Sequence, residues 1–263
     1  MTLIHALILG AVEGITEFLP ISSTAHIMIA AELLHLEQSA FVKSFEIAIQ
    51  VGAICAVLFL YIRTIRKHPN LLTKIVAGFI PTAIIGFALY AFIKNVLLGN
   101  LVVMAWSLLV GGVILIGYEI WEKRWRAEES RVAELTTHVS DISYVHALVI
   151  GSLQALAVVP GVSRSAATIV TGRFLGLGKS VATEFSFLLA VPTIAAAAGY
   201  DILQNSSVIA SANLAPLITG FITAFITALV TIRLLTYFVR RYSFAWFGVY
   251  RIILAVALLL FVI

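Results

Sequence analysis

Two short segments of the chain gather ionisable and hydroxyl side chains within otherwise apolar sequence. The first has two carboxylates and then three hydroxyls and an imidazole: Glu13, Glu17, Ser22, Ser23, Thr24 and His26. The second places an arginine among hydroxyls: Ser163, Arg164, Ser165 and Thr168. Carboxylates and imidazole can move protons, a serine can act as a nucleophile, and a guanidinium can bind a phosphate with two prongs.

The two acids are four residues apart, so a helix would place Glu13 and Glu17 on one face. Their neighbours are apolar, and like charges in such surroundings need compensation by a cation, a facing arginine or a shared proton. Alternatively, the helix lies near the membrane interface and water hydrates both acids.

Each segment also contains a proline followed by hydroxyls, Pro20 to Thr24 and Pro160 to Ser165. Proline ends one helix and serine starts the next, so each segment is predicted to form a helix, a break and a second helix. Helix starts bearing hydroxyls and Arg164 would bind an anion, most naturally phosphate. Alternatively, the serines only cap helices, and Arg164 only pairs with Glu13 or Glu17.

Two consequences follow for the chemistry of such a site. Acids beside a phosphate would repel it unless a divalent cation bridged them, so Glu13 and Glu17 indicate Mg or Ca. His26 lies three residues after Ser23 and could share its helix face, as a base beside a nucleophile would. Direct attack by water that His26 activates fits the sequence equally well.

The composition identifies the setting of these residues. Of 263 residues, 61% are hydrophobic and 11% are charged, and the mean hydropathy is +1.07. A soluble domain usually has 45 to 50% hydrophobic and about 25% charged residues, so the chain is predicted to be an all-α integral membrane protein. The net charge of +4 is assigned to cytoplasmic loops and not to nucleic-acid binding.

Six stretches are long and apolar enough to span a membrane. They are residues 43–62, 74–94, 100–120, 181–200, 214–236 and 244–263. The two regions with proline breaks, 2–35 and 143–176, are predicted to be re-entrant hairpins whose polar tips line a cavity.

Basic residues set the expected orientation. Arg63, Arg66, Lys67 and Lys74 lie between the first two spans, and Lys123, Arg124, Arg126 and Arg131 follow the third. Loops rich in such residues stay in the cytoplasm, so both termini are expected on the outer face. The polar stretch 122–141 is the predicted cytoplasmic linker.

The chain also resembles itself after a shift of about 140 residues. Gly10 to Glu13 aligns with Gly151 to Gln154, Phe45 to Val51 with Phe185 to Val191, and Gly78 with Gly220. We therefore predict one membrane domain with repeats at about 1–121 and 142–263. A unit of one hairpin and three spans has odd parity, so its second copy is inverted and the two tips can meet near the middle.

The two motifs are similar to the signatures of the undecaprenyl-diphosphate phosphatase family, also called the bacitracin-resistance protein. The residues that carry this resemblance run from Glu13 to His26 and from Pro160 to Thr168, with Ala25 and Ala166 where the family usually has glycine. The resemblance covers essentially the whole chain and implies an inner-membrane enzyme that opens to the outer face. It would hydrolyse the terminal phosphate of the lipid diphosphate, regenerating the carrier lipid for peptidoglycan synthesis.

By the same resemblance, the predicted catalytic residues are Glu17, Ser23, His26 and Arg164, with Glu13 and Glu17 as metal ligands. Ser22, Thr24, Ser163, Ser165 and Thr168 would bind the substrate phosphate. A tendency to form homodimers is also implied, and the pair Gly111 and Gly112 offers it a weak packing rationale. A transporter or flippase of a phosphorylated lipid or another anion is the alternative, because inverted repeats with broken helices are transporter architecture.

Overall fold

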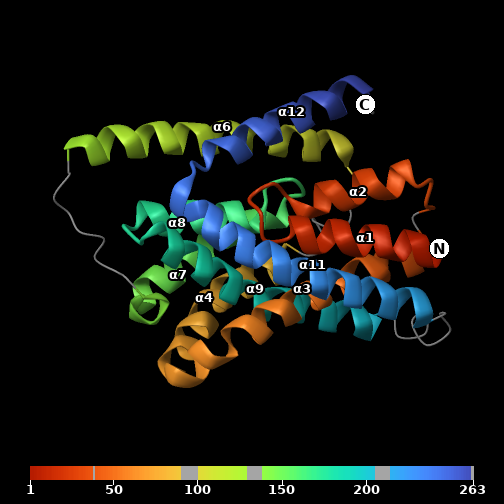
Figure 1. The fold of residues 1–263 in the computed structure, drawn as a ribbon, viewed down its shortest axis with the longest axis horizontal. Helices are drawn as coiled ribbons and strands as arrows, with labels where there is room; N and C mark the ends of the chain where they lie inside the picture. Colours follow the sequence, from red (N-terminus) through yellow and green to blue (C-terminus); the bar gives the residue numbers. More distant parts are fainter. Residues whose placement is uncertain (38, 90–99, 129–137, 205–213, 262–263) are drawn as a thin grey trace.

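Figure 1 shows the computed structural model, which describes residues 1–37, 39–89, 100–128, 138–204 and 214–261. These residues form ten α-helices and two short 3-10 helices, η2 (Val139–Asp141) and η3 (Ala155–Val158), with no strand among them. The prediction of an all-α protein is therefore confirmed for the described part of the chain.

Five of these helices are long and apolar enough to cross a membrane. They are α3 (Ala40–Lys67), α4 (Pro69–Ala88), α6 (Leu101–Glu128), α9 (Lys179–Gln204) and α11 (Leu214–Arg241). Most extend beyond the predicted apolar stretches, because charged residues continue the helix past its apolar part. α4 begins earlier than expected, at Pro69, since proline suits the first turn of a helix. Residues 90–94 of the predicted second span lie outside the described residues.

Two boundaries differ from the sequence prediction. The sixth span, expected at 244–263, is α12 (Ala245–Phe261), whose 17 residues are fewer than the about 20 that a full crossing needs. Residues 262–263 are not described. The predicted linker 122–141 is helical at its start, because α6 continues to Glu128. Residues 129–137 of that linker are outside the described part.

Both predicted breaks are present. α1 (Leu3–Thr16) and α2 (Ser23–Leu33) flank the first, while α7 (Tyr144–Gln154), η3 and α8 (Arg164–Phe174) flank the second. The residues just before α2 and α8 have nearly the same unusual backbone: Ser22 has φ 72° and ψ 95°, and Ser163 has φ 70° and ψ 109°. Positive φ is uncommon for a residue with a side chain, so both tips are locally strained in the same way.

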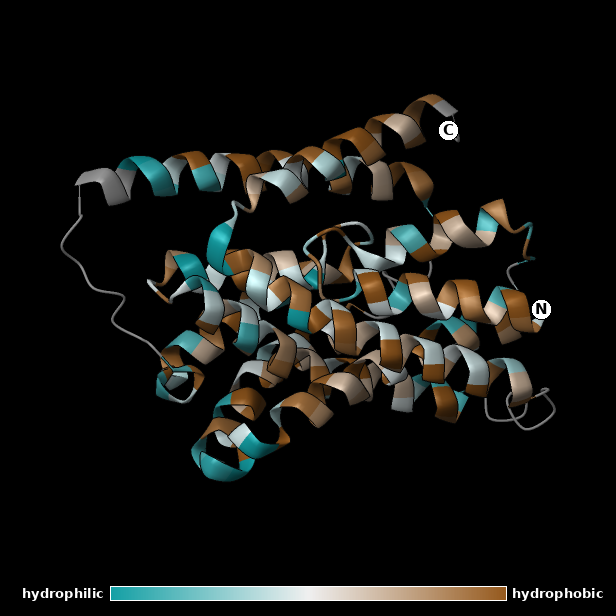
Figure 2. Ribbon diagram, viewed as in Figure 1, coloured by the Kyte–Doolittle hydropathy of each residue, from teal (hydrophilic) through white to brown (hydrophobic). Residues whose placement is uncertain are grey.

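The hairpins approach each other from opposite ends of the molecule (Figure 1). α1 and α2 lie toward the end that carries both chain termini, whereas α7 and α8 lie toward the end with the α3–α4 turn. The charged residues of that turn and of the last part of α6 form the hydrophilic end in Figure 2, and apolar residues cover most of the remaining helix surface.

Glycines allow each hairpin to pack closely on a long helix from the other half of the chain. α1 packs on α11 at Gly10, and α7 packs on α4 at Gly151. A Cβ at Gly10 would meet the backbone oxygen of Gly220, and one at Gly151 would overlap that of Gly78. These are the glycine pairs that the internal alignment superposes, so the two crossings are equivalent.

The pair Gly111 and Gly112 also has a role within the chain. A Cβ at Gly111 would overlap the guanidinium of Arg251, and one at Gly112 would meet the backbone oxygen of Gly248 on α12. The small residues let α6 and α12 approach each other, which removes the packing rationale that they offered for a dimer. Homodimer formation stays a prediction.

Candidate active site

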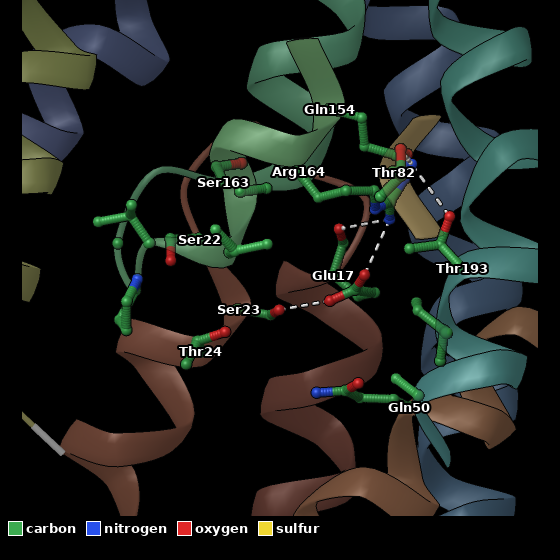
Figure 3. A pocket seen from close by; sticks show the side chains of 17 residues that line it. Glu17, Ser22, Ser23, Thr24, Gln50, Thr82, Gln154, Ser163, Arg164 and Thr193 are labelled. Atoms are coloured by element: carbon green, nitrogen blue, oxygen red, sulfur yellow. Dashed lines mark hydrogen bonds and ion pairs between the residues drawn. The ribbon is translucent and has the colours of Figure 1, made fainter. Parts of the chain in front are cut away.

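A cavity of about 220 Å³ lies where the two hairpin tips meet (Figure 3). Six predicted site residues line it: Glu17, Ser22, Ser23, Thr24, Ser163 and Arg164. Gln50 of α3, Thr82 of α4 and Thr193 of α9 line it as well. The cavity has room for several water molecules and is polar at both tips, as an anion site would be.

Glu17 connects the two tips. It follows the last residue of α1 and is buried, and its Oε1 accepts a hydrogen bond from Nη2 of Arg164 at 2.8 Å. Its Oε2 accepts the hydroxyl hydrogen of Ser23. Figure 3 shows the three side chains in a row across the tip. A carboxylate thus contacts the hydroxyl that could act as nucleophile and the guanidinium that could bind phosphate.

Arg164 is held by more than its ion pair. Its Nη1 donates to the backbone oxygen of Ser186 on α9 at 2.9 Å, and its Cζ lies 5.9 Å from the centre of the Phe18 ring. The predicted alternative, pairing with an acid, is therefore present in the structure for Glu17. Since Arg164 also lines the cavity, its ion pair and a contact with a bound anion are compatible.

Two residues predicted to bind phosphate, Ser165 and Thr168, make hydrogen bonds within the protein instead. The Ser165 hydroxyl donates to the backbone oxygen of Leu19 at 2.7 Å, and so joins the second tip to the first. The Thr168 hydroxyl donates to the Ser186 hydroxyl at 2.6 Å. Neither lines the cavity, because both side chains point from the first turns of α8 into its packing contacts. By contrast, Ser163 lines the cavity and also caps α8, accepting from the Ala166 N–H at 3.3 Å.

The hydrogen bonds of the His26 ring go to partners other than Ser23. Its Nδ1 lies 2.7 Å from the backbone oxygen of Ser22, and its Nε2 lies 2.6 Å from the hydroxyl of Tyr250 on α12. A carbonyl can only accept, so Nδ1 carries a hydrogen, and in the neutral imidazole Nε2 then accepts from Tyr250. The two rings are also stacked, with centroids 5.6 Å apart. The predicted pairing of base and nucleophile is replaced by a pairing of Ser23 with Glu17.

Glu13 is fully buried outside the cavity lining, and neither of its oxygens has a hydrogen-bond partner in the described part of the chain. A buried carboxylate in that state suits a cation, which would satisfy both oxygens. The described residues hold no group of three or more His, Cys, Asp or Glu with metal-binding geometry. Mg²⁺ is commonly held by one or two carboxylates together with substrate phosphates, so two acids are compatible with such a site.

Sequence reasoning missed the polar wall opposite the tips. The amide nitrogen of Gln154 donates to the hydroxyls of Thr82 at 2.9 Å and Thr193 at 3.0 Å. Each threonine in turn donates to a backbone carbonyl, so both accept from the amide. The internal alignment contained a signal, because Gln154 aligns with Glu13. Tyr250 and Arg251 of α12 were also missed, since nothing in the local sequence connects them with the tips.

The two positions that depart from the expected glycines are accommodated. Ala25 is fully buried and its methyl packs in an apolar cluster with Met104, Ala105 and Leu108. Ala166 is buried in the first turn of α8. The added methyl of Ala25 therefore packs into the core and removes no polar group from the tip.

Comparison with known proteins gives one consistent result. The model of the family described as "Bacitracin resistance protein BacA" matches residues 6–257. A protein of Persephonella marina is 46% identical over 263 residues, covering all of both chains, and one of Bdellovibrio bacteriovorus is 44% identical over 260 residues, covering 99% of this chain and 96% of the relative. A protein of Methanococcus aeolicus is 40% identical over 261 residues, covering 99% of each chain. All three are named undecaprenyl-diphosphatase. With both motifs at the tips and the match extending over nearly the whole chain, this protein belongs to the bacitracin resistance protein family.

Proposed function

We propose that the protein is a multi-pass membrane enzyme that hydrolyses the terminal phosphate of undecaprenyl diphosphate and regenerates the carrier lipid. The observation that carries the proposal is the contact of Glu17 with both Ser23 and Arg164 at the wall of the cavity. A transport site must release its ligand intact and needs no base in contact with a nucleophile, so this arrangement favours hydrolysis over transport.

The described geometry supports the following roles. Arg164 and the helix starts at Ser23 and Arg164 would bind the oxygens of the terminal phosphate. Glu17 would take the proton of the Ser23 hydroxyl as Oγ attacks phosphorus. The bond from phosphorus to the bridging oxygen breaks, and the lipid monophosphate leaves with the electron pair. Water would then hydrolyse the phosphoserine. In this scheme Glu17 replaces His26 as the base, and His26 holds the tip through Ser22 and Tyr250.

Direct attack by water remains the second route, and one experiment separates the two. Purified protein is incubated with undecaprenyl diphosphate labelled in its terminal phosphate, and the reaction is quenched in acid. Phosphate attached to Ser23 supports the covalent route, with loss of activity in Ser23→Ala. Appreciable activity in that variant, with no labelled protein, would show that water attacks directly.

A divalent cation, Mg or Ca, would be held by Glu13 and Glu17 and would neutralise charge on the phosphate oxygens. Glu13 supports this role because its buried carboxylate has no hydrogen-bond partner in the described residues. Phosphate release should stop when a chelator is added and return when Mg or Ca is restored in excess. Binding of Mn²⁺, observed by electron paramagnetic resonance, should be lost in Glu13→Gln. Full turnover in the chelator would remove the cation from the proposal.

The cavity is proposed to open to the outer face of the bacterial inner membrane, with six crossings and two hairpins in an inverted repeat. The equivalent glycine crossings and the matching backbone of Ser22 and Ser163 support the repeat. The charged α3–α4 turn lies at the end opposite both termini (Figure 1), which supports the orientation. Cysteines added at each terminus should react with an impermeant reagent in cells with a permeabilised outer membrane. Protection of both ends would overturn this orientation.

A further inference from the structure

Arg251 is the largest fully buried side chain in the described part of the protein, and it lies on α12 away from the cavity lining. None of the ion pairs found among the described residues includes it. A buried arginine at membrane depth is costly unless it is paired, so its partners should explain why it is there.

Those partners are backbone oxygens from three separate elements. Nη1 donates to Pro20 of the first tip at 3.3 Å and to Val162 of the second tip at 3.0 Å. Nη2 donates to Gly161 at 2.9 Å and to Ser107 of α6 at 3.1 Å, and Nε donates to Leu108 at 3.4 Å. One guanidinium therefore connects both re-entrant tips to α6 and α12.

The bonds to Pro20, Gly161 and Val162 fall next to the strained positions. Pro20 is two residues before Ser22, and Val162 directly precedes Ser163, the two tip serines with positive φ. Strained backbone persists only where the surrounding contacts over-determine it. The bond to Val162 also orients a peptide plane: because its carbonyl faces Arg251, the N–H of Ser163 points away from Arg251. Ser163 itself lines the cavity.

We infer that Arg251 is a positioning residue, which holds the two tips in register so that Ser23 and Glu17 on one tip meet Arg164 on the other. This inference rests on the proposed phosphatase function. A shift of about 1 Å between reacting groups can cost about 100-fold in rate. Loss of the anchor should therefore lower kcat much more than it changes KM, since Arg251 itself lies outside the cavity lining.

Two variants test the inference, one by replacing Arg251 and the other by displacing it. Arg251→Lys keeps the charge but loses the planar fork, so it cannot hold five oxygens on several elements. Gly111→Ala leaves Arg251 in place, but the new Cβ would overlap the guanidinium and displace it. The control for Arg251→Lys is Arg173→Lys, because Arg173 is another buried arginine and bonds Tyr118 and Glu122. The control for Gly111→Ala is Gly117→Ala, because Gly117 is also on α6 and a Cβ there would meet nothing within 4 Å.

The experiment measures kcat and KM for phosphate release from undecaprenyl diphosphate, together with the thermal unfolding midpoint in detergent. Both test variants should lose about 10- to 100-fold in kcat per folded molecule, with KM within threefold of the parent value. Arg173→Lys should lower the midpoint without changing kcat, and Gly117→Ala should change neither.

A lower midpoint with an unchanged kcat in both test variants would overturn the inference and leave Arg251 a structural residue. Failure of both variants to fold would overturn it too, because an anchor needed only for folding gives that result. Absence of phosphate release by the parent protein would instead refute the proposed function.

Discussion

The two hairpins have the same architecture but contribute different chemistry. Each has a proline break, a serine with positive φ and a helix that starts at the cavity. The first tip supplies the groups that can react, Glu17 and Ser23, whereas the second supplies Arg164, which can bind charge. In the proposed site the first tip is therefore the reacting half and the second tip the binding half, and their side chains come together where the two tips meet.

One pair of aligned positions shows how the two halves differ. Glu13 and Gln154 occupy matching positions in the internal alignment, and both are buried. The Gln154 amide is fixed by two threonine hydroxyls, while the Glu13 carboxylate has no hydrogen-bond partner in the described part of the chain. The protein thus pairs the amide nitrogen of Gln154, whereas its Oε1 is buried without a partner in the described residues. No donor in the described residues pairs with either oxygen of Glu13, and for this reason the proposed cation is placed in the first half.

Glu17→Gln should have the largest effect, because it removes the reacting half's base while keeping its size. We expect turnover to fall roughly 100- to 10,000-fold, the usual range for loss of a general base. Phosphate release and the unfolding midpoint are measured together, with the exposed residue Glu32 changed to glutamine as the control. Near-normal turnover would contradict the role of Glu17 both as base and as metal ligand.

Arg164→Lys tests the binding half. Lysine keeps the charge and can pair with Glu17, but it cannot contact a phosphate with two prongs. Turnover should fall about 10- to 100-fold with little loss of stability, as expected when a contact matters most in the transition state. The exposed Arg233 changed to lysine is the control. Full activity in Arg164→Lys would leave Arg164 as a counter-ion only.

Gln154→Glu would give the second half a carboxylate at the position that aligns with Glu13 of the first half. The hydroxyls of Thr82 and Thr193 already donate to backbone carbonyls, so a carboxylate there would face acceptors. We expect a loss of about 1 to 3 kcal/mol of stability, the usual cost of an unsatisfied buried polar group. Thermal unfolding in detergent measures it. If Gln154→Glu were as stable as the parent protein, the proposed distinction between the halves would fail.

Tyr250→Phe should have the smallest effect. It removes one hydrogen bond to His26 but keeps the stacked ring, so the first tip would be held less firmly. A single hydrogen bond contributes about 1 kcal/mol, which corresponds to about fivefold in turnover. The comparison with His26→Ala is informative, since loss of the whole imidazole should exceed loss of the bond. Inactivation by Tyr250→Phe to the level of Glu17→Gln would instead make His26 the essential base.

Much of this arrangement could be predicted from local sequence. The apolar stretches predicted the long helices, and the prolines at 20 and 160 predicted both breaks, because each signal acts within a few residues along the chain. The motifs also predicted six of the residues that line the cavity. Ser165 and Thr168 do not line the cavity, since spacing along a helix indicates which face a side chain occupies but not what that face packs against.

The sequence by itself determined that this chain is helical and apolar, and that its polar groups are concentrated at two breaks. Only the tertiary structure decided that Ser23 bonds to Glu17 instead of His26, and that Tyr250 and Arg251 of α12 reach the tips. The contacts of Tyr250 with His26 and of Arg251 with Pro20 join residues more than 200 positions apart. Their partners are backbone oxygens and hydroxyls, which nearly every segment offers, so no local pattern distinguishes the one that folding brings within hydrogen-bond distance.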